Sequence, residues 1–254
     1  MSIDDLGNWR RTSSSSDITP KLDGKKVTVF GWVQEIRDLG GIKFIVLRDK
    51  DGVIQVTMPR NRTSQETMKK ADALQREFVI GVRGIVRKMS KAPHGAEVIP
   101  DEIKILGIAQ QPLPLDPTGR IPADLDVRLN LRLLDLRRPE CQAIFRIRHI
   151  AVSAMRDYLI KNGYIEIHTP KVIASATEGG ATLFPIAYFE REAFLVQSPQ
   201  LYKEQLVSVF EKVFEIGPIF RAEESDTPRH LAEVTSVDVE EAFITVDNLS
   251  LIHI

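Results

Sequence analysis

The chain has 254 residues, of which 43% are hydrophobic and 27% charged, and its formal net charge is −1. This composition is typical of a globular protein rather than of a disordered or a fibrous chain. No apolar run is long enough to span a bilayer, and the acidic start Met1–Asp5 lacks the apolar core of a signal peptide. We therefore expect a cytoplasmic protein with no membrane partner.

Charge is distributed unevenly along the chain. Residues 1–110 hold 19 of the 34 Lys and Arg and 14 of the 35 Asp and Glu, a net charge of +5, which leaves 15 and 21, or −6, for the remainder. A basic first half is typical of nucleic-acid contact, although many solvated surfaces carry an excess of this size. Cys141 is the single cysteine, which excludes an intrachain disulfide and a thiolate metal site, and the five histidines lack metal-ligand spacing.

The first part of the chain has the pattern of a small β-barrel. Residues 1–17 are polar, include the run Ser13–Ser16, and are expected to form a flexible arm. Asp51–Gly52 predicts a tight turn between two strands. Alternating apolar residues predict, in chain order, strands at Val27–Val33, Phe44–Arg48 and Val53–Met58, a helix at Thr67–Arg76, and strands at Val79–Val86, Glu97–Ile99 and Ile103–Leu106. Short strands with one helix between the third and fourth describe an OB-fold barrel over 18–109, which is an oligonucleotide-binding architecture.

A proline-rich stretch, Pro112–Gly119, follows this barrel. Because proline fixes φ and cannot donate to a sheet, we expect a stiff, extended hinge over 110–134. Pro139 suits the first turn of a long helix, and Asn162–Gly163 predicts the left-handed cap that ends it. The helix has one apolar stripe, formed by Ile144, Ile147, Ala151, Ala154 and Tyr158.

Three segments near the end of the chain suggest a nucleotide site. Phe220–Glu223 follows an apolar strand, Arg229–Glu233 comes after a short polar loop, and Asn162–Pro170 lies upstream. Side chains alternate along a strand, so Arg221 and Glu223 are expected to point to the same face. An arginine fork suits a phosphate and a carboxylate accepts from an amine, which together fit a nucleotide.

In that order and spacing, these segments resemble motifs 1 and 2 of class II aminoacyl-tRNA synthetases. Gln197–Lys203 closely resembles the substrate-selective segment of aspartyl-tRNA synthetases. Gly31–Val33, Asp38–Gly41 and Leu136–Glu140 resemble the archaeal and eukaryotic branch of that family. The resemblance runs from Asp17 to Asn248. It implies an α+β multidomain fold, in which an N-terminal OB-fold anticodon-binding barrel precedes the first part of a class II antiparallel α/β catalytic domain, over 135–248.

The activity implied by this resemblance is that of an aspartate–tRNA ligase. Such an enzyme uses ATP and Mg²⁺ to form aspartyl-adenylate, and then transfers aspartate to the 3′ end of tRNA(Asp). Arg221 would be the catalytic residue, contacting the α-phosphate and the substrate carboxylate. The resemblance assigns ATP binding to Arg221, Glu223, Arg229, His230 and Leu231. It assigns aspartate binding to Glu178, Gln200, Lys203 and Arg221.

The resemblance also implies an anticodon site and a dimer interface. In the family, the residues at the positions of Phe44 and Gln55 stack on and read the central uracil, with Arg37 and Glu97 as further anticodon contacts. Pro170 would lie in the interface of a homodimer. Two alternatives stay open. Lys203, considered by itself, could be an exposed lysine on a helix, and Phe44, considered by itself, could be a residue of the barrel core.

Two positions bear on tRNA choice. Archaeal enzymes that charge only tRNA(Asp) tend to have tryptophan at the position of Gln34 and lysine at that of Pro93, whereas enzymes that also charge tRNA(Asn) tend to have histidine and proline. Pro93 therefore favours a non-discriminating enzyme, and Gln34 matches neither pattern.

Three other functions fit parts of this pattern. An asparaginyl-tRNA synthetase is opposed by Pro199 and Lys203, and an aspartate–ammonia ligase lacks the anticodon barrel. The third is a tRNA-binding fragment without catalysis. Residues 249–254 are interpreted as an adaptor-derived tail of a truncated sequence. Motif 3 and the magnesium-binding carboxylates would then lie beyond Asn248, so we expect the fragment alone to be inactive and to hold no metal site.

Overall fold

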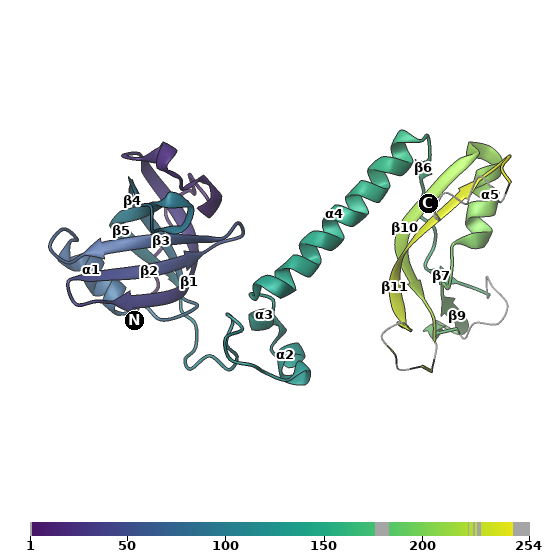
Figure 1. Ribbon diagram of the computed structural model, residues 1–254. Helices are drawn as coiled ribbons and strands as arrows, with labels where there is room; N and C mark the ends of the chain where they lie inside the picture. Colours follow the sequence, from purple (N-terminus) through teal and green to yellow (C-terminus); the bar gives the residue numbers. More distant parts are fainter. Residues whose placement is uncertain (1, 176–182, 223, 226, 228–229, 246–254) are drawn as a thin grey trace. The chain divides into compact units, whose positions relative to one another are not determined.

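The computed structural model describes residues 2–175, 183–222, 224–225, 227 and 230–245. The chain divides into two compact units, Met1–Pro139 and Glu140–Ile254, and each is described by itself (Figure 1).

The first unit is built on a closed five-stranded barrel with the order β1-β2-β3-β5-β4. Its neighbouring strands pair antiparallel except for β3 and β5, which are parallel. The elements are β1 (Lys26–Asp38), β2 (Ile42–Arg48), β3 (Val53–Pro59), α1 (Gln65–Asp72), β4 (Val79–Lys88) and β5 (Ala96–Gly107). This topology confirms the OB-fold predicted from the sequence.

The barrel core follows from strand alternation. In β2, Ile45 and Leu47 point inward and are fully buried, whereas Phe44 and Val46 lie on the outer side and are half-buried. The inward residues of all five strands join one apolar cluster together with residues of α1. Phe44 is therefore not a core residue, and that alternative is wrong.

Two barrel elements differ in extent from the prediction. The last two predicted strands form one strand, β5, which continues through Pro100 opposite Gly84 of β4, where the register shifts. α1 begins earlier than expected, because the Ser64 side chain accepts a hydrogen bond from Thr67 N at 3.2 Å and so caps the helix. It also ends earlier, at Asp72.

The N-terminal segment is packed on the barrel, in contrast to the expected flexible arm. Trp9 is 3% exposed and lies under the cations of Arg83, at 4.3 Å, and Lys104, at 5.1 Å. Ser15 begins a short 3₁₀ turn, Ser15–Asp17, and donates its backbone N and its Oγ to Asp49 at 2.7 and 2.5 Å. The serine run is thus held by a buried carboxylate that local sequence does not reveal.

The segment after the barrel is shaped by ion pairs as well as by proline. Asp116 pairs with Arg76 of the barrel unit at 2.6 Å. Two short helices, α2 (Leu125–Asn130) and α3 (Arg132–Asp135), lie within or overlap the stretch expected to be extended. They are held by Asp135, which is fully buried and pairs with Arg128, Arg132 and Arg138 at 2.8, 2.6 and 3.4 Å.

The second unit combines a long helix with two small sheets of order β11-β10-β6 and β7-β9-β8. Its elements are α4 (Pro139–Lys161), β6 (Ile165–Glu166), β7 (Val172–Ile173), β8 (Pro185–Tyr188), β9 (Arg191–Leu195), α5 (Gln200–Phe210), β10 (Lys212–Phe220) and β11 (Glu233–Glu241). Val196 links the sheets, because its N donates to Lys171 O at 3.0 Å and its O accepts from Phe220 N at 2.9 Å.

α4 ends as predicted. Gly163 has φ 85°, and Tyr164 N donates to Leu159 O at 3.1 Å, which is a left-handed cap. The predicted apolar stripe is largely exposed, with Ile144 at 64% and Ile147 at 67%. Among the described residues, no helix is both long and apolar enough to cross a membrane.

Candidate functional site

A cavity of ≈ 650 Å³ opens on the outer side of the barrel. Its apolar wall includes Phe44, whose ring is half-buried there. Its polar wall includes Gln55, Thr57 and Glu97, and its rim carries four cations, Arg62, Arg87, Lys88 and Lys91. An accessible aromatic ring, hydrogen-bonding groups and cations are what a site for a single-stranded base and its phosphates requires.

Strand register brings the polar wall together. Phe44 of β2 pairs with Thr57 of β3, and Gln55 lies two residues before Thr57 on the same outer side. Gln55 Nε2 donates to Glu97 Oε2 at 2.8 Å and to Thr57 Oγ1 at 3.2 Å, and Thr57 Oγ1 donates to Glu97 Oε2 at 2.6 Å. Three of the four predicted anticodon residues thus share one cavity.

The fourth, Arg37, lies beside Phe44 in the sheet. It pairs with Phe44 across β1 and β2, and its guanidinium forms a bidentate pair with Glu35 at 3.0 Å for both bonds. These hydrogen bonds hold the pKa of Glu35 below its ordinary value. Arg37 is therefore held next to the cavity by its own strand.

The two positions linked to tRNA choice lie elsewhere. Gln34 occupies the irregularity in the β1–β2 register and lines a separate cavity of ≈ 290 Å³ with Arg76, Asp116 and Arg120. Pro93 begins the 3₁₀ turn Pro93–Gly95 before β5 and is half-buried.

In the second unit, Lys203 lies in the first turn of α5, which packs against β10 and β11. It is 4% exposed, and its Nζ lies 3.3 Å from Asp238 Oδ1 and 3.5 Å from Glu240 Oε2. Asp238 and Glu240 are two residues apart on β11, so their carboxylates share one face. The alternative of an exposed helix lysine is wrong, because this cation is buried beside two carboxylates.

Gln200 stands at the start of the same helix, after Pro199. Its backbone N donates to Ser198 Oγ at 3.2 Å, and its Nε2 donates to Glu204 Oε1 at 2.9 Å. The Gln200 side chain is therefore oriented by a residue of its own helix. The segment just before this helix is joined to β10 at Val196, whose O accepts from Phe220 N.

The segment around Pro170 is fixed to β10 by a buried carboxylate. Glu215 is 2% exposed and accepts from Thr169 N at 2.9 Å and Thr169 Oγ1 at 2.8 Å. Lys171 Nζ lies 2.9 Å from Glu215 Oε1. Pro170 thus lies between two residues, Thr169 and Lys171, that both contact the Glu215 carboxylate.

Three of the predicted ATP residues, Arg221, His230 and Leu231, are described, and they lie between β10 and β11. Arg221 comes directly after β10, donates its N to Ala232 O at 3.0 Å, and has an exposed side chain. His230 Nδ1 lies 2.7 Å from Thr227 Oγ1, and Leu231 is 57% exposed. Glu178, Glu223 and Arg229 lie outside the described residues.

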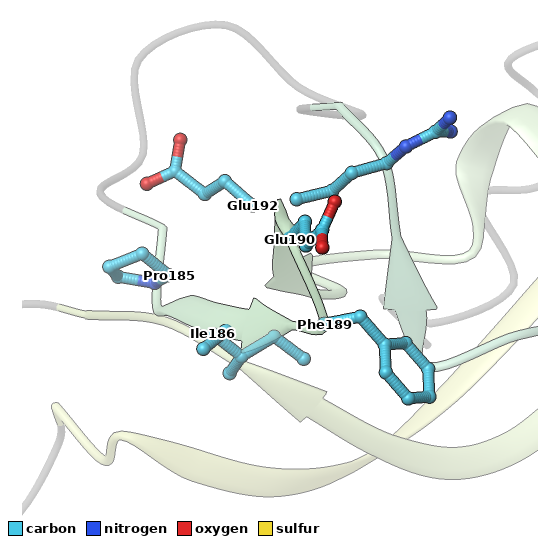
Figure 2. Close-up of a pocket in the computed structure, with 7 residues that line it drawn as sticks. Pro185, Ile186, Phe189, Glu190 and Glu192 are labelled. Atoms are coloured by element: carbon cyan, nitrogen blue, oxygen red, sulfur yellow. The ribbon is translucent and has the colours of Figure 1, made fainter.

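A further cavity of ≈ 420 Å³ lies at the hairpin of β8 and β9. Figure 2 shows the ring of Phe189, which lies with Glu190 in the turn, and Glu192 on β9. Phe189 is 90% exposed and has φ 54°. No predicted site residue lines this cavity.

Sequence reasoning missed four side chains that hold the predicted ones in place. Asp238 and Glu240 alternate with valines along β11, and this acidic face was the available signal. Thr57 and Glu215 had no such signal, because their partners lie 40 and 46 residues away in the chain. Within the described ranges, no three His, Cys, Asp or Glu side chains form a candidate metal site.

Comparison with known proteins agrees with both units. A family model described as tRNA synthetases class II (D, K and N) matches residues 124–253, about half of the chain, and one described as OB-fold nucleic acid binding domain matches residues 27–106. The chain belongs to the class II tRNA synthetases of the D, K and N group. The OB-fold match lies over β1 to β5, and the synthetase match begins just before α2.

Among relatives of this class II synthetase chain, the aspartate–tRNA(Asp/Asn) ligase of Archaeoglobus fulgidus is 56% identical over 90% of the chain and 54% of the relative. The aspartate–tRNA(Asp) ligase of Pyrococcus abyssi is 56% identical over 92% of the chain and 54% of the relative. The chain therefore spans about half the length of these relatives. The crystal structure of asparaginyl-tRNA synthetase from Pyrococcus horikoshii with asparaginyl-adenylate has a TM-score of 0.87 at 34% identity, over 94% of this chain and 55% of that one.

Proposed function

We propose that this chain supplies the anticodon-binding barrel and the first part of the catalytic domain of an aspartate–tRNA ligase. The enzyme would activate L-aspartate with ATP to aspartyl-adenylate and transfer it to the 3′ end of tRNA(Asp). One observation carries this proposal: Lys203 is a buried cation in the catalytic unit, placed beside Asp238 and Glu240.

This group of charges suits an acidic amino acid. A lysine ammonium has three hydrogens, and the carboxylates of Asp238 and Glu240, at 3.3 and 3.5 Å, leave it able to donate to a further acceptor. We assign that acceptor to the side-chain carboxylate of aspartate. An amide in its place is neutral and has only one acceptor oxygen, so asparagine would bind less well. Gln200 and Glu178 are proposed as further aspartate contacts, Glu178 for the substrate ammonium.

We assign the ATP phosphates to the turn after β10. Arg221, whose side chain is exposed there, would stabilise the charge on the α-phosphate as the aspartate carboxylate attacks it. Glu223, Arg229, His230 and Leu231 complete the proposed nucleotide contacts. Mg²⁺ would accompany ATP, since this ion binds mainly through substrate phosphates with few protein carboxylates.

The barrel cavity is proposed as the anticodon site. Phe44 would stack on the central uracil, with Gln55 reading its edge and Arg37 close by. tRNA(Asn) is a second acceptor in this proposal, because Pro93 favours it. The relative named for tRNA(Asp/Asn) and the one named for tRNA(Asp) are equally similar to the chain and favour neither choice.

We further propose a cytoplasmic homodimer in which α4 and the segment of Pro170 meet a second copy. The apolar side chains of α4 support this, because Ile144, Ile147 and Ile150 are 64, 67 and 65% exposed and form a stripe along one side.

Lys203→Met in the full-length enzyme tests the substrate. We expect kcat/KM for aspartate in pyrophosphate exchange to fall about 10- to 150-fold, because a charge-assisted hydrogen bond contributes roughly 1.5–3 kcal/mol. The KM for ATP should stay unchanged, and the preference for aspartate over asparagine should shrink. Lys161→Met, at the exposed end of α4, is the matched control. Unchanged preference in Lys203→Met would contradict the proposal. Aminoacylation of purified tRNA(Asp) and tRNA(Asn) by the full-length enzyme tests the second acceptor, and strict preference for tRNA(Asp) would exclude it.

A further inference from the structure

We propose that Glu97 and Thr57 are positioning residues that hold the amide of Gln55 in one orientation, so that Gln55 offers only a hydrogen-bond acceptor to the base in the barrel cavity. This inference rests on the proposed function, in which that base is the central uracil of an anticodon. It assigns Glu97 to Gln55 rather than to a base.

The orientation follows from the chemistry of the partners. An ionised carboxylate has no hydrogen to donate, so the side of the Gln55 amide that faces Glu97 Oε2, at 2.8 Å, is the NH₂ side. Thr57 Oγ1 gives its hydrogen to Glu97 Oε2 at 2.6 Å, so it also acts as an acceptor toward Gln55 Nε2 at 3.2 Å. Both hydrogens of the amide are thereby used within the protein.

The remaining atom of the amide is Gln55 Oε1. No group in the part of the chain that the structure describes donates a hydrogen bond to it. Gln55 lines the cavity together with Phe44. A base stacked on Phe44 therefore meets an acceptor from Gln55 and no donor.

Burial keeps this arrangement in place. Thr57 and Glu97 are 3 and 4% exposed, so water competes little for their hydrogen bonds. The strands beneath them are held by Val56 and Val98, which pair across β3 and β5 and are fully buried in the core. Rotating the Gln55 amide by half a turn would set its oxygen against the Glu97 carboxylate and break both bonds.

A fixed acceptor discriminates between the two pyrimidines. The pairing edge of uracil has one donor, N3–H, between two carbonyl oxygens, whereas N3 of cytosine is itself an acceptor. Gln55 Oε1 therefore pairs with uracil and is opposed by a lone pair in cytosine at the same place. If the amide were free to rotate, it would accept from uracil or donate to cytosine with similar ease.

Glu97→Gln tests the mechanism, because the new amide can donate to Gln55 Oε1 and so permits Gln55 to rotate. Binding of the 254-residue chain is measured to RNA hairpins that differ only at the central loop base, which is uridine, cytidine or 3-methyluridine. We expect the wild type to prefer uridine over cytidine by about tenfold and to bind 3-methyluridine as weakly as cytidine, since the methyl group removes the N3 donor. In Glu97→Gln the preference should fall to about twofold or less.

Thr57→Val provides a second, graded variant. It leaves the bond between Glu97 and Gln55 and removes only the Thr57 hydroxyl, so we expect an intermediate preference of about threefold to fivefold. Thr28→Val, another threonine that is buried in the barrel unit but does not line the cavity, is the matched control and should keep the wild-type ratio. The ratio for the two pyrimidines, rather than affinity alone, separates an orienting role from loss of folding.

Two results would overturn the inference, and they differ in what else they imply. If Glu97→Gln and Thr57→Val bind uridine hairpins and keep the wild-type preference, the positioning role is wrong while the anticodon site stands. If the wild-type chain binds none of the hairpins, the proposed function of the barrel fails together with the inference.

Discussion

At the scale of single residues, buried carboxylates hold the irregular parts of both units in place. Glu215 takes two hydrogen bonds from Thr169 and one cation, Lys171, and so fixes the segment after α4 to β10. Asp116 has the same role after the barrel, where it accepts from Thr118 Oγ1 at 2.7 Å and from Arg76 at 2.6 Å. Each carboxylate accepts hydrogen bonds from backbone or side-chain donors in a loop, which would otherwise have to bind water.

Asp116 makes the stability of the first unit depend on pH. Burial alone would raise the pKa of Asp116, but hydrogen bonds from Thr118, Arg76 and backbone amides outweigh it and hold the pKa well below its ordinary value of 3.8. Because the folded pKa is depressed, the stabilisation is complete above the unfolded pKa and is lost as the pH falls toward the folded pKa. We expect wild type to exceed Asp116→Asn in free energy of unfolding at neutral pH, and the difference to shrink below a pH of about 4.

Urea unfolding followed by circular dichroism at several pH values measures this difference. Asp124→Asn is the control, since Asp124 is exposed and its side chain makes no cap hydrogen bond to α2. A difference between wild type and Asp116→Asn that stays constant down to low pH would rule out the ionised carboxylate as its source.

At the scale of elements, local sequence predicts the barrel strands and the end of α4 well, because alternation and capping residues act over a few positions. Prediction from local sequence fails where residues distant in the chain determine the structure of a segment. The serine run is ordered by Asp49, which lies 34 residues further along the chain. β5 continues through Pro100 because β4 pairs with it on both sides of the register shift at Gly84.

The candidate site shows the same division. The outer position of Phe44 follows from the alternation of β2, although the sequence alone left open which side faced the core. The surroundings of Lys203 could not be predicted in this way, because Asp238 lies 35 residues away on a strand that reaches it only after folding. The alternation of apolar residues thus predicts which side of a strand a residue lies on. Which charged side chains come into contact is decided only when the chain folds.

At Gly84, close packing of β4 against β5 leaves no room for a side chain. A Cβ there would lie 2.2 Å from Ile99 O, a backbone atom that cannot move without displacing β5. We expect Gly84→Ala to lower the free energy of unfolding by about 1–3 kcal/mol or more, as overpacking does in cores. Gly41→Ala is the matched control, because nothing lies within 4 Å of a Cβ at that glycine. Equal urea midpoints for the two variants would contradict this account.

At the scale of the whole molecule, α4 is notable because it leaves most of its apolar side chains exposed. Its buried side chains are Cys141 and Leu159, whereas the stripe with Ile144 and Ile147 remains accessible. An exposed apolar stripe of this kind is where we propose that a second copy of the chain binds.

Ile147→Glu in the full-length protein tests that surface. We expect the variant to sediment as a monomer at concentrations where wild type is a dimer, because a buried unpaired carboxylate opposes association. His149→Glu is the control, since His149 is also exposed but lies about 200° further round the helix. Dimers of equal strength in both variants would exclude the Ile147 stripe from the interface.

The packing of Trp9 has a spectroscopic consequence. The chain has 2 tryptophans and 4 tyrosines, and the division between the units separates them by type. Trp9 and Trp32 both belong to the barrel unit, whereas the second unit holds Tyr158, Tyr164, Tyr188 and Tyr202. Indole emission therefore reports on the barrel unit. Unfolding of the barrel unit can be followed by this emission in an unlabelled sample, and release of the N-terminal segment from Arg83 and Lys104 would change the surroundings of Trp9.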